Sequence, residues 1–370
     1  MIYLDANATT EVSEHVRSSL LTGLGESWGN PSSNHEVGAR ARRAMAKARD
    51  DIVSLIPGAL PEGIIFTSGG TEANNLIIKG ILDASVVTTA VEHPSVIRPA
   101  EATGRALISP IDQNGIVLID RLVELVPETG PVIVTFQWAN SETGIVQPVQ
   151  QIVSAIRKKR FDTFIHVDVA QAIGRVAISM DGLDAITFSG HKLHAPGGTG
   201  VLLLGDPNDR RVHSQILGGG QQNGWRSGTE NVLGSIALGA ALSERAKQFN
   251  QAVLQLAHLR DTFERVLLAA VPNARVNGKD SPRVPNTSNI LFPGLEAMEI
   301  VALLDQMDVA CSVGSACSSG KPEASYVLTA MGLSEVEAYS SVRFSVSVMN
   351  TEGELLEAAD RVARVVRSRS

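Results

Sequence analysis

The chain has 370 residues, which at roughly 150 residues per domain is enough for about two domains. Its formal net charge of −7 provides no overall basic field for binding nucleic acid or an anionic membrane surface. Two cysteines cannot form a disulfide framework, and no apolar run approaches the ~18 residues of a membrane span. These features favour a cytoplasmic, enzyme-type protein with no direct nucleic-acid or membrane partner.

Short apolar, β-branched segments alternate with helical patterns from residue 63 to residue 204. Several of these segments are apolar at successive positions, which is typical of strands that are covered on both faces. The predicted strands span residues 63–69, 85–92, 131–138, 163–169, 184–190 and 200–205, and the predicted helices span Glu72–Gly80, Ser95–Thr103 and Val149–Arg160. This βαβ succession predicts an α/β fold with a mostly parallel central sheet.

The stretch from Asn231 to Ala270 is rich in Ala, Leu, Arg and Glu at helical spacing, which predicts a long helical connection between two domains. After it we predict a strand over 286–293, a helix over Glu296–Met307, a loop over Ser312–Lys321, a helix over Glu323–Met331, a strand over 340–347 and a helix over Glu352–Arg367. These elements form a smaller α/β C-terminal domain. We assign residues 15–255 to the large domain, and residues 1–14 and 256–370 to the small one.

Two glycines and a threonine follow the first predicted strand, in the order Gly69, Gly70, Thr71. The glycines allow a tight turn, and the free N–H groups at the start of the next helix suit a phosphate group, with the Thr71 hydroxyl as a further donor. An ordinary helix N-cap is the alternative interpretation. The chain contains neither GxxxxGK[ST] nor GxGxxG, so nothing supports a P-loop or a Rossmann dinucleotide site.

Four further polar residues come just after predicted strands. Asp168 lies at the carboxyl edge of the predicted sheet, where open parallel sheets bind ligands, and a helix N-cap is its alternative role. Gln171, three residues later, offers an amide donor to the same ligand. His93 is either a packed or capping residue, or a flat ring that stacks on a ligand or moves protons. Lys192 is either a solvated surface charge or a desolvated, nucleophilic amine with a lowered pKa.

Four consecutive strand ends are expected to bring Gly70 and Thr71, His93, Asp168 and Lys192 to one rim of the sheet. A phosphate site, a stacking ring, an acid for a pyridine nitrogen and a lysine for covalent attachment are the requirements of pyridoxal phosphate as an electron sink. We therefore predict pyridoxal 5'-phosphate as the cofactor and expect no metal ion.

The chain resembles the cysteine desulfurases of the class V aminotransferase group (NifS/IscS-like) over essentially its whole length. The motifs that carry the resemblance are YLDANATT, GNPSSNH, TSGGTEANN, VEHPSV, HVDVAQ, SGHK, RSGTEN and SVGSACSS. The resemblance implies the aminotransferase fold type I and a homodimer. It assigns covalent attachment of the cofactor to Lys192, ring stacking to His93, pairing with the pyridine nitrogen to Asp168, contact with the phenolic oxygen to Gln171, and phosphate binding to Thr71, Ser189, His191 and Thr229 of a second subunit.

A loop of small residues from Ser312 to Gly320 carries Cys317 and is expected to be mobile. From the residues alone, Cys317 is either a loop cysteine without a function or a thiol that carries sulfur from a substrate to a partner. The resemblance assigns it as the persulfide carrier. Cys311 ends an apolar, strand-like run and is expected to be packed in the interior, and two cysteines at this spacing are not a zinc signature.

Arg343 is a charge within an otherwise apolar strand. A guanidinium in that position suits bidentate binding of a carboxylate, and an ion pair with one of the protein's own acids is the alternative. By the resemblance, Arg343 binds the substrate α-carboxylate, with Asn140 and Ser141 nearby. The family usually has a second asparagine where this chain has Ser141, so the cofactor contact made by that asparagine is in doubt here.

The resemblance implies conversion of L-cysteine to L-alanine, with the sulfur left on Cys317 as a persulfide for an acceptor protein. Iron–sulfur cluster assembly, tRNA thiolation and DNA phosphorothioation are the destinations we consider. Alternatives are a selenocysteine lyase, another class V aminotransferase without a thiol step, and a cofactor-free scaffold of the same fold. Replacing Cys317 by serine is expected to abolish sulfide release from cysteine but to leave a true aminotransferase working. The purified protein is expected to be yellow, whereas a colourless protein that pyridoxal phosphate cannot restore would favour the scaffold.

Overall fold

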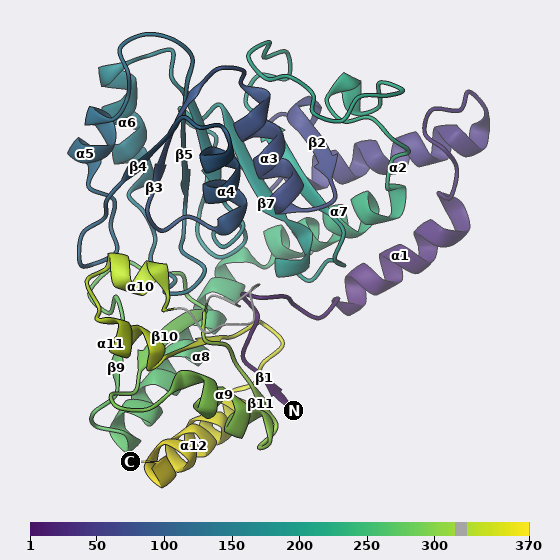
Figure 1. Ribbon diagram of the computed structural model, residues 1–370. Coiled ribbons are helices and arrows are strands. Elements are labelled where there is room, and N and C mark those ends of the chain that lie inside the picture. Colours follow the sequence, from purple (N-terminus) through teal and green to yellow (C-terminus); the bar gives the residue numbers. More distant parts are fainter. Residues whose placement is uncertain (315–323, 370) are drawn as a thin grey trace.

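The computed structural model describes residues 1–314 and 324–369 (Figure 1). A large α/β part is built on a seven-stranded sheet, and a smaller part contains a three-stranded sheet and a two-stranded sheet with helices. Both chain termini lie in the smaller part (Figure 1). The predicted fold class, a large domain with a mostly parallel sheet and a smaller α/β C-terminal domain, is confirmed.

The large sheet has the strand order β2-β8-β7-β6-β5-β3-β4. Its strands are β2 (Ile64–Thr67), β3 (Ser85–Thr89), β4 (Ala106–Ser109), β5 (Val132–Gln137), β6 (Phe164–Asp168), β7 (Ala185–Ser189) and β8 (Gly200–Leu204). The strands from β7 to β4 pair in parallel, whereas β8 pairs antiparallel with both β7 and β2. Strand β2 therefore points the same way as the parallel strands, and its C-terminal end lies at the same edge of the sheet.

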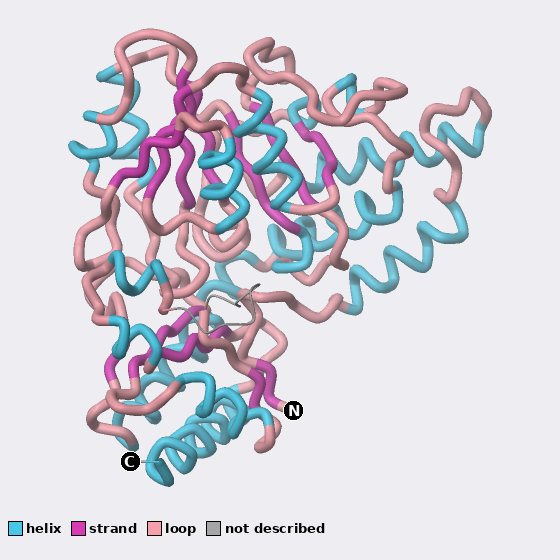
Figure 2. Tube along the Cα trace, in the orientation of Figure 1, coloured by secondary structure: helices cyan, strands magenta, loops and turns pink. Residues whose placement is uncertain are grey.

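Helices cover both faces of this sheet (Figures 1 and 2). They are α1 (Glu14–Glu26), α2 (Glu36–Val53), α3 (Gly70–Gly80), α4 (Pro94–Ala102), α5 (Ile119–Glu124), α6 (Val149–Lys159) and α7 (Val232–Lys247). In β5, Val132 and Val134 pack into the core shared with α2, α6 and α7, whereas Ile133 packs into the core shared with α3 and α4. Because successive residues face two apolar layers, several strands are apolar at consecutive positions, as the sequence predicts.

Helices α1 and α2 are not among the predicted elements. They pack against α7 and extend to one side of the molecule (Figure 1). The buried residues of α2 are spaced as on one helix face, at Ala41, Met45, Ala48 and Ile52, so the sequence does carry their signal. The hydroxyl of Ser13 accepts a hydrogen bond from Val16 N and caps the start of α1.

The predicted helical connection consists of two helices, α7 and α8 (Phe249–Ala270), separated at Gln248. The backbone of Gln248 (φ −114°, ψ 11°) leaves the helical region and redirects the chain. Helix α7 packs against the large part and α8 packs against α12 (Glu352–Arg369). The proposed boundary between residues 255 and 256 falls within α8 and stays a prediction.

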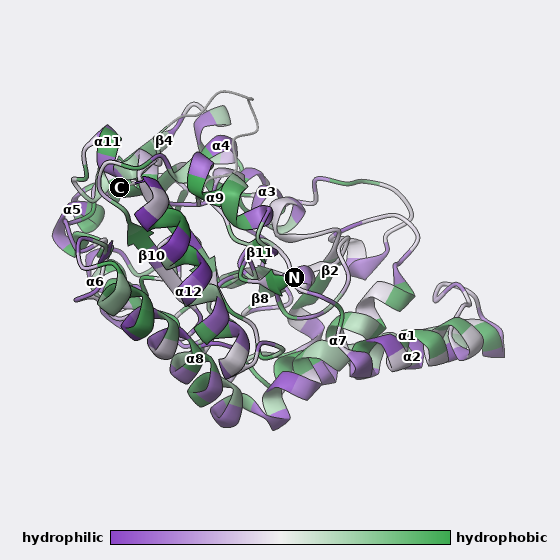
Figure 3. Ribbon diagram, turned by 90° about the horizontal axis from the view of Figure 1, so that it is seen from below, coloured by the Kyte–Doolittle hydropathy of each residue, from purple (hydrophilic) through white to green (hydrophobic). Residues whose placement is uncertain are grey.

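The smaller part has its own apolar core, which includes Ile2 and Leu4 at the start of the chain. Its remaining elements are β1 (Ile2–Tyr3), β9 (Arg275–Val276), β10 (Thr287–Leu291), α9 (Ala297–Asp305), β11 (Val309–Ala310), α10 (Tyr326–Ala330), α11 (Glu335–Tyr339) and β12 (Ser341–Ser345). Strand β10 pairs antiparallel with β9 and β12, and β1 pairs parallel with β11. Helices α8 and α12 lie side by side (Figure 3). Within the described ranges, no helix combines the length and the apolar character needed to cross a membrane.

Candidate active site

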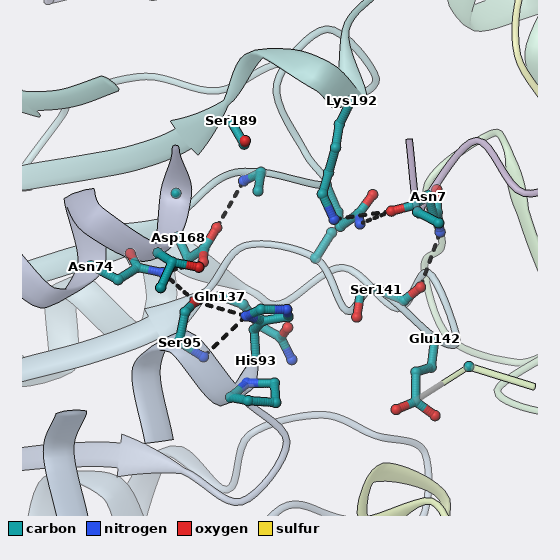
Figure 4. A pocket seen from close by; sticks show the side chains of 18 of the residues that line it. Asn7, Asn74, His93, Ser95, Gln137, Ser141, Glu142, Asp168, Ser189 and Lys192 are labelled. Atoms are coloured by element: carbon teal, nitrogen blue, oxygen red, sulfur yellow. Dashed lines mark hydrogen bonds between the residues drawn. The ribbon is translucent and has the colours of Figure 1, made fainter. Parts of the chain in front are cut away.

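A pocket of about 340 Å³ opens at the C-terminal edge of the large sheet (Figure 4). The predicted site residues that line it are Gly70, Thr71, His93, Ser141, Asp168, Gln171, Ser189, His191, Lys192 and Arg343. Asn7 from the N-terminal segment also lines it, as do Gly314 and Tyr326 from the C-terminal part of the chain. The fold thus brings together residues that are more than 300 positions apart in the sequence.

The predicted rim exists, but its four strands are not consecutive. Strand β8 lies between β2 and β7, and β5 lies between β6 and β3. The predicted strand over 131–138, which is β5, already lies between two of these strands in chain order, so the four are not consecutive in the sequence either; the pairing order in the sheet, including the place of β8, has no local sequence signal. Strand β5 contributes Gln137 to the pocket. Strand β8 begins at Gly200 so close to the glycine turn that a Cβ there would lie 2.5 Å from the backbone of Gly69.

The carboxylate of Asp168 is buried at the end of β6 and is held from two sides. Its Oδ2 accepts a hydrogen bond from Asn74 Nδ2 at 2.9 Å, and its Oδ1 accepts one from Ala170 N at 2.9 Å (Figure 4). The contact with Ala170 N closes a short turn, and no helix begins in the described residues between β6 and β7, so Asp168 is not the helix N-cap of the alternative interpretation. The same side chain lines the pocket. Asp168 therefore serves the local turn and faces the pocket at once.

His93 is the N-cap of α4, as the capping interpretation predicts, and it also lines the pocket, where ring stacking or proton transfer stays a prediction. Its Nδ1 accepts a hydrogen bond from Ser95 N at 3.1 Å and lies 2.7 Å from Ser95 Oγ. An acceptor at Nδ1 places the proton of the neutral ring on Nε2. Desolvation by burial lowers the pKa of His93, as does the charge of Lys192, although Asp168 opposes them.

Lys192 extends from the turn after β7 into the pocket, where its Nζ donates a hydrogen bond to the backbone oxygen of Asn7 at 2.9 Å (Figure 4). Desolvation and the charges of Arg175 and Arg343, opposed by Asp168, together lower the pKa of Lys192 to about 8. About one-tenth of this amine is therefore neutral and nucleophilic at pH 7, far more than for an ordinary lysine. The alternative of a solvated surface lysine is wrong.

One end of the pocket is rich in hydrogen-bond donors. The N-cap of α3 is Gly69, and no side chain caps the helix start, so Thr71 is not the ordinary N-cap of the alternative interpretation. Gly70 and Thr71 line the pocket there beside Ser189 and His191. Uncapped N–H groups at a helix start, hydroxyls and a histidine together suit an anionic phosphate.

Arg343 pairs with the protein's own acid, Asp5, through Nη2 and Oδ1 at 2.6 Å, as the alternative for this residue predicts. Its Nη1 donates to the carbonyl oxygens of Ser141 at 3.1 Å and Gly314 at 3.4 Å. The Nε atom is buried without a partner among the described residues. Arg343 also lines the pocket, where a guanidinium suits an anionic ligand.

Asn140 does not line the pocket, although it was expected to contact the substrate. Its Oδ1 accepts hydrogen bonds from the backbone N–H groups of Glu142 and Thr143, both at 2.9 Å, and its Nδ2 donates to Val91 O. Asn140 therefore holds the shape of the loop that carries Ser141. Ser141 does line the pocket, and its backbone oxygen accepts a hydrogen bond from Asn7 Nδ2 at 3.1 Å. Thr229 is exposed and lies outside this pocket in the single chain.

A family model described as aminotransferase class-V matches residues 2–357. The chain belongs to the class V aminotransferase family. Within this family, cysteine desulfurase 2 of Trichormus variabilis (strain ATCC 29413 / PCC 7937) is 41% identical over 367 residues, which cover 96% of this chain and 90% of that protein. The similarity to cysteine desulfurases that the motifs indicate is confirmed.

Solved structures of similar proteins support the same fold. The NifS-like protein from Rickettsia africae ESF-5 has a TM-score of 0.90 to this chain and is 31% identical, with 99% of each chain covered. A structure of SspA in complex with cysteine has a TM-score of 0.81 and 27% identity, and covers 95% of this chain and 100% of that one. These class V aminotransferase relatives confirm fold type I for the whole chain.

The pocket fits the pyridoxal phosphate of class V aminotransferases in the chemistry of its donors. The donor-rich end suits a phosphate, and the buried Asp168 suits a protonated ring nitrogen. His93 presents a flat ring to the same pocket, and Lys192 presents an amine with a lowered pKa. Each chemical group of the cofactor thus has a matching residue type on the pocket wall.

Cys317, the expected sulfur carrier, lies outside the described residues. The described residues on either side of that segment do reach the pocket: a Cβ on Gly314 would lie 2.7 Å from Glu142 Oε2, and that oxygen accepts a hydrogen bond from Ser325 Oγ at 2.6 Å. Cys311 is partly buried and packs against the smaller core, as the sequence predicts in part, and burial raises its pKa to about 12. A thiol with that pKa is unreactive.

Sequence reasoning missed several pocket residues, namely Asn7, Asn74, Ser95, Gln137, Glu142 and Tyr326. Asn7 and Asn74 lie within the motifs YLDANATT and TSGGTEANN, so the motifs mark the segments without revealing which side chains matter. Glu142 reaches the pocket from the loop after β5, and Tyr326 reaches it from α10 in the C-terminal part of the chain. No local pattern of spacing marks either of them as a site residue.

Proposed function

We propose that this protein is a pyridoxal 5'-phosphate-dependent cysteine desulfurase, which converts L-cysteine to L-alanine and receives the sulfur on Cys317 as a persulfide. The observation that carries the proposal is the meeting of Lys192, Asp168 and His93 in one pocket that Arg343 also lines. Similarity to named cysteine desulfurases over nearly the whole chain supports the same activity. The structure of SspA in complex with cysteine supports the substrate.

The cofactor would be held by residues from both ends of the pocket. Thr71, Ser189 and His191 would bind its phosphate, with Thr229 of the partner subunit in a homodimer. Asp168 would hold a proton on the ring nitrogen, Gln171 would donate to the phenolic oxygen, and His93 would stack on the ring. Bound pyridoxal phosphate withdraws electrons from an amino acid joined to it, which makes the Cα proton acidic.

Lys192 would act both as the attachment point and as the base that removes and returns the Cα proton. Its pKa of about 8 allows the amine to gain and lose a proton near neutral pH. Arg343 would bind the substrate α-carboxylate through its pocket-facing donors, beside the backbone of Ser141. His93, whose neutral ring has its N–H on the side away from Ser95, would protonate the carbon that becomes the alanine methyl group.

The thiolate of Cys317 would attack the substrate sulfur. The bond between that sulfur and the substrate carbon breaks, a sulfur–sulfur bond forms on Cys317, and the electron pair stays with the carbon, which takes up a proton. The persulfide would then pass to an acceptor protein for iron–sulfur cluster assembly, tRNA thiolation or DNA phosphorothioation. We assign this exchange to the cytoplasm, where thiols stay reduced.

The experiment compares purified wild-type protein with Cys317→Ser, Cys311→Ser and Lys192→Ala, each supplied with pyridoxal phosphate, L-cysteine and a reducing thiol. Alanine and sulfide are quantified together. We expect equimolar alanine and sulfide from the wild type and from Cys311→Ser, and a loss of at least about 100-fold for Cys317→Ser and Lys192→Ala. Undiminished sulfide release by Cys317→Ser, or a protein that stays colourless with the cofactor, would overturn the proposal.

A further inference from the structure

A buried arginine, Arg175, lies behind the pocket and is not one of its lining residues. In the described part of the chain no carboxylate lies within ion-pair distance of its guanidinium. Burial lowers the pKa of Arg175 to about 9, so the group still carries its charge at neutral pH. A buried charge without an acidic partner is costly and calls for strong hydrogen-bond acceptors around it.

Those acceptors belong to three segments of the site. Arg175 Nη1 donates to the side-chain oxygen Oε1 of Gln171 and to Asn7 Oδ1, the latter at 3.1 Å, and Nη2 reaches the backbone oxygen of Lys192 at 3.4 Å. One guanidinium therefore joins the turn after β6, the N-terminal segment and the turn after β7.

The contact with Gln171 fixes the direction of its amide. A guanidinium has only donors, so the atom of Gln171 that it contacts must be the oxygen. The amide nitrogen then points the other way, where it donates to the backbone oxygen of Asn7 at 3.1 Å. The same Asn7 oxygen accepts the hydrogen bond from Lys192 Nζ at 2.9 Å, so both donors converge on one point of the pocket wall.

We propose that Arg175 is a positioning residue that locks the Gln171 amide with its NH₂ group toward the pocket, so that Gln171 can only donate to a bound ligand. This inference rests on the proposed function, in which the ligand atom facing Gln171 is the phenolic oxygen of pyridoxal phosphate, an acceptor. With the amide reversed, two acceptors would face each other. Without Arg175 only the hydrogen bond to the Asn7 backbone oxygen still orients the amide, so the reversed, unfavourable orientation becomes accessible.

A double-mutant cycle tests the proposal. Cofactor-free wild type, Arg175→Met, Gln171→Met and the double variant are titrated with pyridoxal phosphate, and the dissociation constant and the absorption spectrum of the bound cofactor are measured. We expect each single variant to bind about tenfold more weakly or worse, and the double variant to bind no more weakly than Gln171→Met alone, because the two residues act through one contact. Arg175→Lys, which keeps a donor, should recover part of the loss and covers the case in which Arg175→Met does not fold.

Arg245→Met is the matched control, because it removes a neighbouring buried cation that does not contact Gln171. It should lower the melting temperature and leave the dissociation constant unchanged. Wild-type affinity in Arg175→Met, or losses that add in the double variant, would overturn the inference while leaving the proposed function intact. Failure of the wild type itself to bind the cofactor would instead reject the proposed function.

Discussion

Asn74 donates a hydrogen bond through Nδ2 to Oδ2 of Asp168 at 2.9 Å, in the buried layer beneath the pocket. The second N–H of the same amide reaches Ser95 Oγ at 2.9 Å, and Ser95 contacts the ring of His93. Asn74 Oδ1 accepts a hydrogen bond from Thr187 Oγ1 at 2.5 Å, which fixes the amide orientation. One asparagine thus orients both the acid and the stacking ring assigned to the cofactor.

Replacing Asn74 by alanine should weaken cofactor binding by roughly 10- to 100-fold. The reason is that an unpaired buried acceptor costs about 1–3 kcal/mol, and a tenfold change in affinity corresponds to about 1.4 kcal/mol. Titration of the cofactor-free variant with pyridoxal phosphate measures the change. Asn277→Ala is the matched control, since Asn277 also uses both amide protons in buried hydrogen bonds, to Asn289 and Ser341 in the smaller part. Equal affinity in Asn74→Ala and Asn277→Ala would contradict the prediction.

The amine of Lys192 should react at lower pH than ordinary lysines. Desolvation and the charges of Arg175 and Arg343, opposed by Asp168 and Asp5, together lower its pKa to about 8. Only the neutral amine reacts with an acylating reagent, so labelling of the cofactor-free protein should rise with pH and reach half its maximum near pH 8. Peptide mass spectrometry measures the extent of labelling at Lys192 and, for comparison, at the exposed Lys158. A half-maximum near 10.5 for Lys192 would refute this prediction.

Glu92 should make the protein less stable as the pH rises from about 5 to 8. Its side chain is fully buried, with Oε1 near Thr89 Oγ1 and with Oε2 unpartnered among the described residues. Desolvation raises the pKa of Glu92 to about 8, so in this interval the folded protein holds a proton that the unfolded chain releases.

The Glu92→Gln variant has no titratable carboxyl group at this position, so its stability is compared with that of the wild type. Its free energy of unfolding, relative to wild type, should increase with pH by roughly 2–5 kcal/mol between pH 5 and 8, at about 1.4 kcal/mol for each unit of pKa shift. Denaturant unfolding at three pH values measures the difference. A difference that does not depend on pH would show that the carboxyl group is already ionised at pH 5.

Alanine at Gly314 should slow turnover at least about tenfold without weakening cofactor binding. A Cβ at this position would lie 2.7 Å from Glu142 Oε2, the oxygen bonded to Ser325, and the backbone φ of +93° disfavours any side chain. Gly332→Ala is the control, because Gly332 has a similar φ of +90° and open space around it. Equal turnover in the two variants would show that backbone strain, and not the contact with Glu142, decides the effect.

The sequence predicted the strand ends well because each one combines an apolar run with a polar residue, as at Asp168. It did not predict the antiparallel β8 or the place of β5 in the sheet, since pairing between distant strands leaves no local pattern. For Arg343 the sequence left two roles open, and the structure adds the ion pair with Asp5, which lies 338 positions away. The sequence did not mark Asn7 or Arg175 as site residues. Each of them acts through contacts among three chain segments that are distant in the sequence, and such contacts leave no local pattern.

The most direct test of the central claim is mass spectrometry of the protein after brief incubation with L-cysteine and without a reducing thiol. The account predicts that the peptide containing Cys317 gains the mass of one sulfur atom, in an amount equal to the alanine formed, and that the peptide containing Cys311 gains none. Alanine formation with no added sulfur on Cys317 would contradict the account.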